Sequence, residues 1–571
     1  MKALLIILGL FVAYGHAQNV LIENINIVDV TDGTLKDSRH ILIENGRIAK
    51  VSRSQLTPKD GTTVIDGNGK YAMPGMVDTH IHFFQTGSIY TRPDALDMTD
   101  VKSYEDELTF AMDMVPDSFQ RYLRVGVTSI MDVGGPFSNF KVRDSITPIY
   151  ISPNVFVTGP LFSPYQPEAL SQLDDVPIVK ITSIAEATKL FNTLLERKPD
   201  FIKVWYIANN SMPAEATYPI VAHIAALCRD NNLKLAVHAT QKKTAELAVK
   251  AGADILVHSI DDEPATAEFA TLLKENDVTY IPTLIVSKNY VKSFLGKPDN
   301  HFSDLYFANP ETYRSLTYFQ KYDSDNVPAN VRQVWDNETR INEIYDERIA
   351  TMNKSLLLLQ KAGVTIATGT DAGNIGTMHA SSYIQEQEAM WRAGLSVAEI
   401  LKASTINAAK GFGLDGEIGS VTEGKKADIL VLDENPLAAL KNLNSLEMTI
   451  KDGVVLPVSN LITESPEQVV QRQVNAYNAR DIDAFMDTYA DTIKIYNFPD
   501  QLSMDGKKAM RAQFAQMFEN VPNLYCEIKN RMVLGNKVVD REYVRFGEQY
   551  SSVIAIYEVT DGKISKVTFL R

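Results

Sequence analysis

The sequence GMVDTHIH, residues 75–82, closes an apolar run that begins at Tyr71 and is typical of a buried strand. It contains His80 and His82, two of only nine histidines in the chain. Side chains two apart on a strand point to the same side, so both imidazoles can face one point. Neutral imidazole is a common ligand for transition metals. The stretch predicts a metal site at a strand end, although an isolated pair of this kind is as often a simple strand terminus.

Apolar strand-like runs recur from residue 74 to about residue 413, and helical periods separate several of them. The eight runs are Met76–His82, Val127–Val133, Val155–Gly159, Phe201–Tyr206, Leu233–His238, Ala253–His258, Val278–Ile285 and Thr365–Asp371. The helical stretches include Ile184–Glu196, Ala214–Asp230, Thr244–Ala251 and Ala267–Glu275. This α/β alternation predicts a parallel sheet closed into a TIM-like (β/α)8 barrel. An open doubly wound sheet is the alternative, but no Gly-x-Gly-x-x-Gly follows an early strand.

Length and charge restrict the organisation and the partners. At 571 residues the chain is too long for one ordinary domain, so two or three are expected. A net charge of -15 argues against nucleic acid or an anionic membrane surface as a partner, because either would need basic patches. Neither nucleic acid nor a membrane is therefore expected as a partner.

The first seventeen residues have the pattern of a secretory signal peptide. Lys2 precedes an apolar stretch over residues 3–12, and small residues precede the predicted cleavage after Ala17. The stretch is too short to span a bilayer as a helix, and no cysteine follows Ala17, so a lipoprotein is not expected. A buried N-terminal element is the alternative. We expect a secreted or periplasmic protein with no membrane attachment after cleavage, and buried, unpaired thiols at Cys228 and Cys526.

The segments around the barrel suggest three additions. Residues 18–70 and 416–460 contain short alternating strands and are expected to form one β-sandwich flanking a barrel over 71–415. Residues 288–348 are rich in aromatic and charged side chains and follow the seventh strand; we expect a helical lid, with a plain surface insertion as the alternative. Residues 465–571 show helices first and then strands, which predicts a separate α+β domain.

Six ligand-type residues fall at or near strand ends on the face where barrel enzymes place their active sites. They are His80, His82, Lys203, His238, His258 and Asp371. Lys203 lies inside an apolar strand, where an ammonium is costly to bury. Its neutral amine could take up carbon dioxide and form a carbamate that bridges two cations; an ion pair with Asp200 is the alternative. Asp371 could bind metal and act as general base and then general acid, although a lone aspartate there would more often cap a helix.

On these residues the chain resembles the amidohydrolase superfamily, in particular its binuclear prolidase-like and imidazolonepropionase-like hydrolases. The resembling stretches are 73–82, 126–132, 201–203, 237–238, 251–258, 369–373, 403–409 and 419–432. The resemblance implies one ion held by His80, His82 and Asp371, a second held by His238 and His258, and carboxylated Lys203 between them. It also implies a bridging hydroxide that attacks a carbonyl carbon.

The subclass follows from two positions. Deaminases of the superfamily carry a glutamate three residues after the fifth-strand histidine, where this chain has Gln241; purely mononuclear members lack the lysine that is Lys203 here. The resemblance therefore implies a two-metal hydrolase of a small-molecule substrate, an amide, dipeptide or acyl amino acid, with a lactone or ester as the alternative substrate. Zinc, manganese and cobalt all suit the ligand set, and we expect zinc. Tyr206 and His379 are the candidate substrate contacts.

The C-terminal segment resembles the cone-shaped fold of nuclear transport factor 2 and ketosteroid isomerase, in its polyketide-cyclase-like branch, through residues 477–485 and the order of its elements. The resemblance implies dimer contacts, and hence a homo-oligomer, or a site for an apolar ligand. Two competing hypotheses follow: an inactive barrel that only binds a ligand through this tail domain, and an isomerase or cyclase centred on it.

Overall fold

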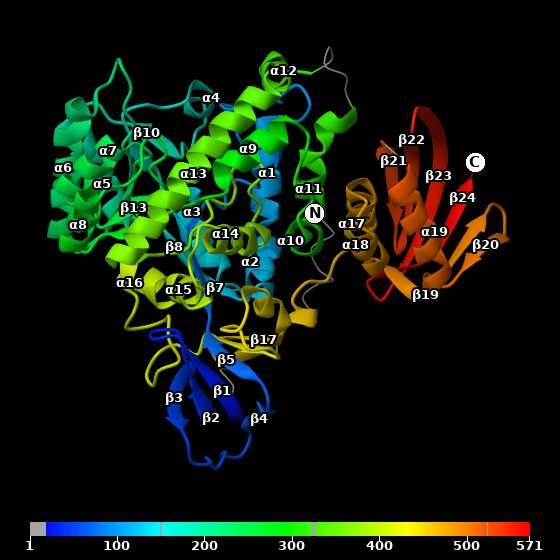
Figure 1. The fold of residues 1–571 in the computed structure, drawn as a ribbon, viewed down its shortest axis with the longest axis horizontal. Helices are drawn as coiled ribbons and strands as arrows, with labels where there is room; N and C mark the ends of the chain where they lie inside the picture. The colour runs from blue at the N-terminus through cyan, green and yellow to red at the C-terminus, as the bar shows by residue number, and fades with distance from the viewer. Residues whose placement is uncertain (1–18, 149–150, 322–326, 522, 571) are drawn as a thin grey trace.

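The computed structural model describes residues 19–148, 151–321, 327–521 and 523–570 (Figure 1). The predicted signal peptide lies outside these residues. No helix within the described ranges is long and apolar enough to cross a membrane.

The central domain is built on parallel strands in the expected order. The strands that follow the eight predicted runs are β6 (Met76–Ile81), β7 (Val127–Asp132), β8 (Asn154–Val157), β11 (Ile202–Trp205), β12 (Leu235–His238), β13 (Ile255–Val257), β14 (Thr279–Ile281) and β15 (Thr365–Ile366). β6, β7 and β8 pair in one sheet, and β11 to β15 pair in sequence in another, with β9 (Leu161–Ser163) and β10 (Ile178–Lys180) at its edge. Backbone hydrogen bonds join the ends: Asp371 N donates to His80 O (2.7 Å), and Asp200 N donates to Val157 O (3.0 Å).

The helices between these strands match the sequence closely. α5 (Ile184–Glu196), α6 (Ala214–Asp230) and α8 (Ala267–Glu275) have the predicted bounds, while α7 (Lys242–Ala251) begins two residues before the expected Thr244. Ser183 and Thr266 cap α5 and α8 by accepting backbone N–H groups of the first turn, which explains where these helices start. The other helices of this domain are α1 (Tyr104–Asp113), α2 (Val115–Arg124), α3 (Ser138–Lys141), α4 (Glu168–Ser171), α14 (Ser381–Arg392), α15 (Val397–Ala403) and α16 (Ile406–Gly411).

Strands from both flanking segments pair in one eight-stranded sheet, drawn below the barrel in Figure 1. The two segments meet where β16 (Ile429–Leu432) runs antiparallel to β5 (Tyr71–Pro74), which itself pairs with β1 (Val20–Asp29). The remaining strands are β2 (Thr34–Glu44), β3 (Arg47–Ser52), β4 (Thr63–Asp66), β17 (Leu446–Lys451) and β18 (Val454–Pro457). The shared pairing buries one core made by both segments, with Val20, Ile22 and Ile41 from the first and Ile429, Val431 and Ile450 from the second.

The expected lid is helical. It contains α9 (Val286–Phe294), α10 (Phe302–Phe307), α11 (Pro310–Leu316), α12 (Ala329–Asp336) and α13 (Glu338–Ala362). The last of these runs fourteen residues past Arg348, the predicted end of the insertion, because Gly363, in the left-handed conformation (φ 79°), is the residue that ends the helix.

The C-terminal domain contains α17 (Pro466–Ala479), α18 (Ile482–Asp487), α19 (Lys507–Asn520) and a six-stranded sheet. Its strands are β19 (Tyr489–Asn497), β20 (Gln501–Asp505), β21 (Tyr525–Leu534), β22 (Lys537–Phe546), β23 (Gln549–Thr560) and β24 (Lys563–Leu570). Four of these strands, β21 to β24, follow the last helix. Cys228 and Cys526 are buried free thiols, as predicted.

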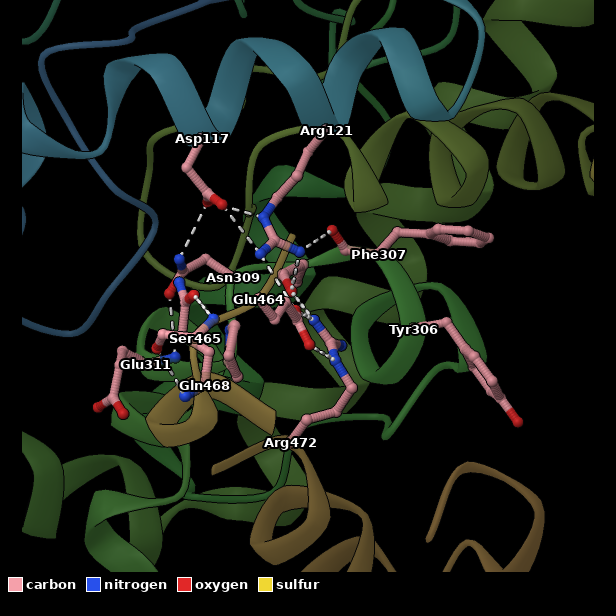
Figure 2. A network of polar contacts seen from close by, with 12 residues as sticks. Asp117, Arg121, Tyr306, Phe307, Asn309, Glu311, Glu464, Ser465, Gln468 and Arg472 are labelled. Atoms are coloured by element: carbon pink, nitrogen blue, oxygen red, sulfur yellow. Dashed lines mark hydrogen bonds and ion pairs between the residues drawn. The ribbon is translucent and has the colours of Figure 1, made fainter. Parts of the chain in front are cut away.

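A buried charge network attaches this domain to the lid and the barrel (Figure 2). Glu464, just before α17, accepts hydrogen bonds from Arg472 of α17 and from Arg121 of α2, the latter at 3.2 Å. Both guanidinium groups also donate to the carbonyl of Ala308, between α10 and α11, at 3.1 and 3.0 Å. One carboxylate thus connects three parts of the molecule.

Candidate metal centre and substrate pocket

Strand alternation decides which side chains reach the interior of the barrel. Phe201, just before β11, belongs to the inner core cluster, so Lys203 and Trp205, two and four residues on, lie on the same side. On β12 the inner residue Ala236 likewise places His238 inward. The strands pair Trp205 with His238 in register, and their rings lie 5.8 Å apart.

The predicted ligands converge. His80 Nε2 and His82 Nε2 lie 3.3 Å apart, and each is 3.2 Å from Asp371 Oδ1. His258 Nδ1 is 3.9 Å from Asp371 Oδ2, and the rings of His238 and His258 are 4.4 Å apart. His80, His258 and Asp371 form a group whose ligand atoms all lie within 4.8 Å of one another. Lys203 is fully buried among them, 1% exposed.

The donor set fits divalent cations. Nitrogen ligands about 2.0–2.1 Å from a tetrahedral zinc ion lie about 3.3 Å from one another, the spacing of the two histidine nitrogens here. Among the described residues, Lys203 Nζ and His238 Nδ1 are buried with no hydrogen-bond partner. Buried polar atoms are rarely left unpaired, so these atoms point to a missing partner such as a metal or a modification of the lysine.

Electrostatics keep the ligands in the protonation states that metal binding requires. Burial lowers the pKa of His80 and of His238 to about 3, so both imidazoles are neutral. Burial also lowers the pKa of Lys203 to about 7, so a large fraction of neutral amine is present near neutral pH. Burial opposes ionisation of Asp371, but the surrounding imidazoles outweigh it and hold its pKa well below the usual value.

Neighbouring groups fix the ligands. His82 Nδ1 donates to Gly134 O (2.7 Å), which directs Nε2 to the centre. Asp78 accepts from Thr370 Oγ1 (2.7 Å), next to Asp371 in the chain. Asp371 and His258 both have positive φ, 64° and 76°, a strained conformation that clusters at functional sites. A Cβ on Gly373 would lie 2.4 Å from His82 O, so only glycine permits this approach of the eighth-strand loop to the first.

The centre forms the floor of a cavity of about 670 Å³. One wall comes from the barrel, with Phe84 in the loop after β6, Leu161 on β9, Ile178 on β10 and Trp205 on β11. The other wall comes from the insertion, whose lining residues are Val286, Ser287, Tyr290, Val291, Phe294, Val334, Ile341 and Tyr345. The insertion therefore forms part of the pocket and is not a remote surface addition. Arg92 and Asn374 add polar groups beside Asp371.

The two predicted substrate contacts do not line this cavity. Tyr206 faces the outer core, and its hydroxyl donates to Ala214 O (2.7 Å), because it is one residue out of phase with Lys203. His379 is buried between Gln85 O (2.7 Å) and the Tyr122 hydroxyl (3.1 Å). Sequence reasoning missed Trp205, although the same alternation identifies it. Nothing in the sequence distinguished Arg92, Tyr290 or Asn374.

Comparisons with known proteins agree with this geometry. The model of the amidohydrolase family matches residues 71–456, and that of the SnoaL-like domain matches residues 470–567. Ochratoxinase of Aspergillus niger is 27% identical over 215 residues, 37% of this chain and 35% of that enzyme. Imidazolonepropionase of Rubrobacter xylanophilus is 37% identical over 102 residues, 17% of this chain and 25% of that enzyme. The matches thus span about a third or less of these relatives.

Solved structures share the fold. A Xaa-Pro dipeptidase with methionine in its active site aligns with a TM-score of 0.58 and 20% identity, over 77% of this chain and all of that chain. The family model covers more than half of the sequence, and the predicted ligands meet where the family resemblance requires. The chain therefore belongs to the amidohydrolase family and carries a SnoaL-like domain at its C-terminal end.

Proposed function

We propose that this protein is an exported, metal-dependent amidohydrolase that cleaves the carbon–nitrogen bond of a small, largely apolar amide. The observation that carries the proposal is the meeting of His80, His82 and Asp371 within 3.3 Å, beside a buried lysine amine without a partner, on the floor of a large pocket. Ochratoxinase and prolidase-like hydrolases among the similar proteins support a hydrolytic role.

Each residue has a role in the proposal. His80, His82 and Asp371 would hold one ion and His238 and His258 the other, with Lys203 between them as its carbamate. Two divalent ions, zinc in our proposal, would supply polarisation of the carbonyl and activation of water at neutral pH. Asp371 accepts the proton of the attacking water and returns it to the departing nitrogen. The surrounding apolar walls exclude bulk water and strengthen these interactions.

The lining residues narrow the substrate class. The only carboxylate that lines the described part of the pocket is Asp371 itself. A free dipeptide would place its α-ammonium here without an acidic partner, which is costly. The apolar and aromatic walls instead favour an acylated amine with an apolar acyl group.

The test is hydrolysis of a panel by zinc-loaded enzyme, followed by detection of the released amine. The panel contains N-aromatic-acyl and N-alkanoyl amino acids, the corresponding free dipeptides, and an aryl lactone. We expect release from the acyl amino acids that is lost in Asp371→Asn. Cleavage of the lactone with no amine released from any amide would replace the proposal with the lactonase alternative.

A second candidate function concerns the C-terminal domain. It encloses a cavity of about 430 Å³ lined by Tyr477, Phe485 and Phe514, with the hydroxyl of Tyr557 donating to buried Glu542 (2.6 Å). This supports binding of an apolar ligand there. Apolar side chains on its outer strands, such as Leu534 at 82% exposed, support self-association. Light scattering after size-exclusion chromatography tests the oligomer, and a fluorescent apolar probe tests the cavity.

A further inference from the structure

A hydrogen-bonded chain of three pocket residues ends on the carboxylate of Asp371. The side-chain amide of Asn374 donates from Nδ2 to Asp371 Oδ1 (2.7 Å). Its carbonyl oxygen accepts from Arg92 Nη1 (2.7 Å) and from the Tyr290 hydroxyl (2.8 Å). Because a guanidinium can only donate, the amide orientation is unambiguous: carbonyl towards Arg92, N–H towards Asp371.

The acceptor atom is the one that faces the centre. Asp371 Oδ1 is the oxygen 3.2 Å from both His80 Nε2 and His82 Nε2. A hydrogen bond to this atom fixes the rotation of the carboxylate and leaves Oδ2 on the side of His258. Asn374 also contacts the backbone carbonyl of Asp371, through Nδ2 at 3.3 Å and its own N–H at 3.4 Å, and so restrains a residue whose backbone is strained.

Arg92 would otherwise be the obvious anchor for a substrate carboxylate, because it is the cation beside Asp371 in the pocket lining. Each of its three nitrogens already donates a hydrogen bond: Nε and Nη2 to Asp94 at 2.8 and 2.6 Å, and Nη1 to Asn374 at 2.7 Å. Asp94 also neutralises its charge. The geometry therefore gives Arg92 the task of holding Asn374.

We propose that Asn374 is a positioning residue that fixes the rotation of Asp371, so that one carboxylate oxygen faces the metal centre and the other stays free for proton transfer, with Arg92 and Tyr290 holding its amide. This rests on the proposed amidohydrolase function. Tyr290 lies on α9 of the insertion, so the chain connects the lid to the catalytic carboxylate through residues that an occupant of the pocket would touch.

The experiment compares wild type with Asn374→Ala, Tyr290→Phe, Arg92→Lys and Arg92→Met. Four quantities are measured: kcat and KM on the best amide substrate, metal content, the rate of zinc loss to a chelator, and the melting temperature. Asn276→Ala, at the exposed end of α8 where Nδ2 donates to Leu272 O, is the matched control for the asparagine. Arg340→Lys, on the surface of α13, is the control for the arginine.

We expect Asn374→Ala to lose about 10- to 100-fold in kcat, the usual effect of removing a group that orients a metal ligand, while KM changes little. It should also lose zinc faster than wild type. Tyr290→Phe should cost about two- to tenfold, because one of two donors remains. Arg92→Lys retains a hydrogen-bond donor and should therefore have a higher kcat than Arg92→Met.

An unchanged kcat and an unchanged rate of zinc loss in Asn374→Ala would overturn the inference. A drop in kcat that a lower melting temperature alone explains would overturn it as well. A large rise in KM with kcat unchanged in the Arg92 variants would make Arg92 a substrate anchor and equally overturn it. Failure of the proposed function has a different signature, namely wild-type protein without bound metal. If the wild type binds metal but cleaves no substrate of the panel, the rate of zinc loss from wild type and Asn374→Ala still tests the inference.

Discussion

Replacing Glu464 by glutamine should release the C-terminal domain from the lid. Burial raises the pKa of this carboxyl, but Arg472 and Arg121 outweigh that and lower it from 4.5 to about 2. The shift corresponds to about 3 kcal/mol of folding free energy at neutral pH. This value agrees with the cost of about 3–5 kcal/mol for removing one partner of a buried ion pair. Glu464→Gln keeps the size of the side chain and removes only its charge.

The stabilisation that Glu464 contributes depends on pH in a definite direction. Because the folded-state pKa is depressed, the stabilisation is fully present above pH 4.5 and is lost as the pH falls from 4.5 towards 2. The deficit of the variant should therefore be the same at pH 7 and pH 5.5 and should shrink only below 4.5. Urea unfolding, monitored by circular dichroism, measures the free energy of unfolding of both proteins at each pH.

The control is Glu343→Gln. This glutamate pairs with Arg340 at 3.3 Å on the surface of α13, with both side chains more than half exposed, so its loss should change stability by less than about 1 kcal/mol. A loss of stability in Glu464→Gln no larger than that of the control would refute the conclusion that the Glu464 carboxylate joins the C-terminal domain to the lid and the barrel.

Three further results are expected. Trp205→Ala should reduce kcat/KM by more than tenfold, because the indole forms a pocket wall beside His238. Tyr206→Phe should leave kcat/KM within about twofold and lower the free energy of unfolding by about 1 kcal/mol, because it loses the hydrogen bond to Ala214 O. Steady-state kinetics and thermal unfolding of both variants check this. Chelation should abolish activity and lower the melting temperature, and added zinc should restore both, since a ligand bound only to the folded state stabilises it by mass action; calorimetry with and without chelator measures it. His379→Gln should change stability more than KM, because the ring bonds Gln85 O and Tyr122 instead of facing the pocket; unaltered stability with a raised KM would restore His379 as a substrate contact.

The barrel and the convergence of the predicted ligands could be foreseen because both follow from local patterns. Apolar runs of strand length determine the order of β6 to β15, and five of the eight runs contain the six ligand-type residues that the fold brings together. The same alternation should have selected Trp205 in place of Tyr206, and the error was one of strand phase. The starts of α5 and α8 follow from their caps Ser183 and Thr266, and α6 follows from its apolar face.

Other features depend on contacts between distant segments and have no local signal. Asn374 is one polar residue in a glycine-rich loop until the fold brings Arg92, 282 positions earlier, against it. Glu464 is an ordinary linker acid until Arg121 and Arg472 close around it. Such pairings arise from tertiary packing, which a single sequence does not display.

The proposed function is tested most directly by the metal content per chain of wild type and Lys203→Ala, each expressed with zinc and bicarbonate in the medium and measured by elemental analysis. Lys203 is buried, has no hydrogen-bond partner and lies among the predicted ligands, so we expect close to two ions in wild type and a clear loss in the variant. Equal metal content in both proteins would contradict a bridging role for Lys203, and no bound metal in wild type would contradict the metal-dependent hydrolase itself.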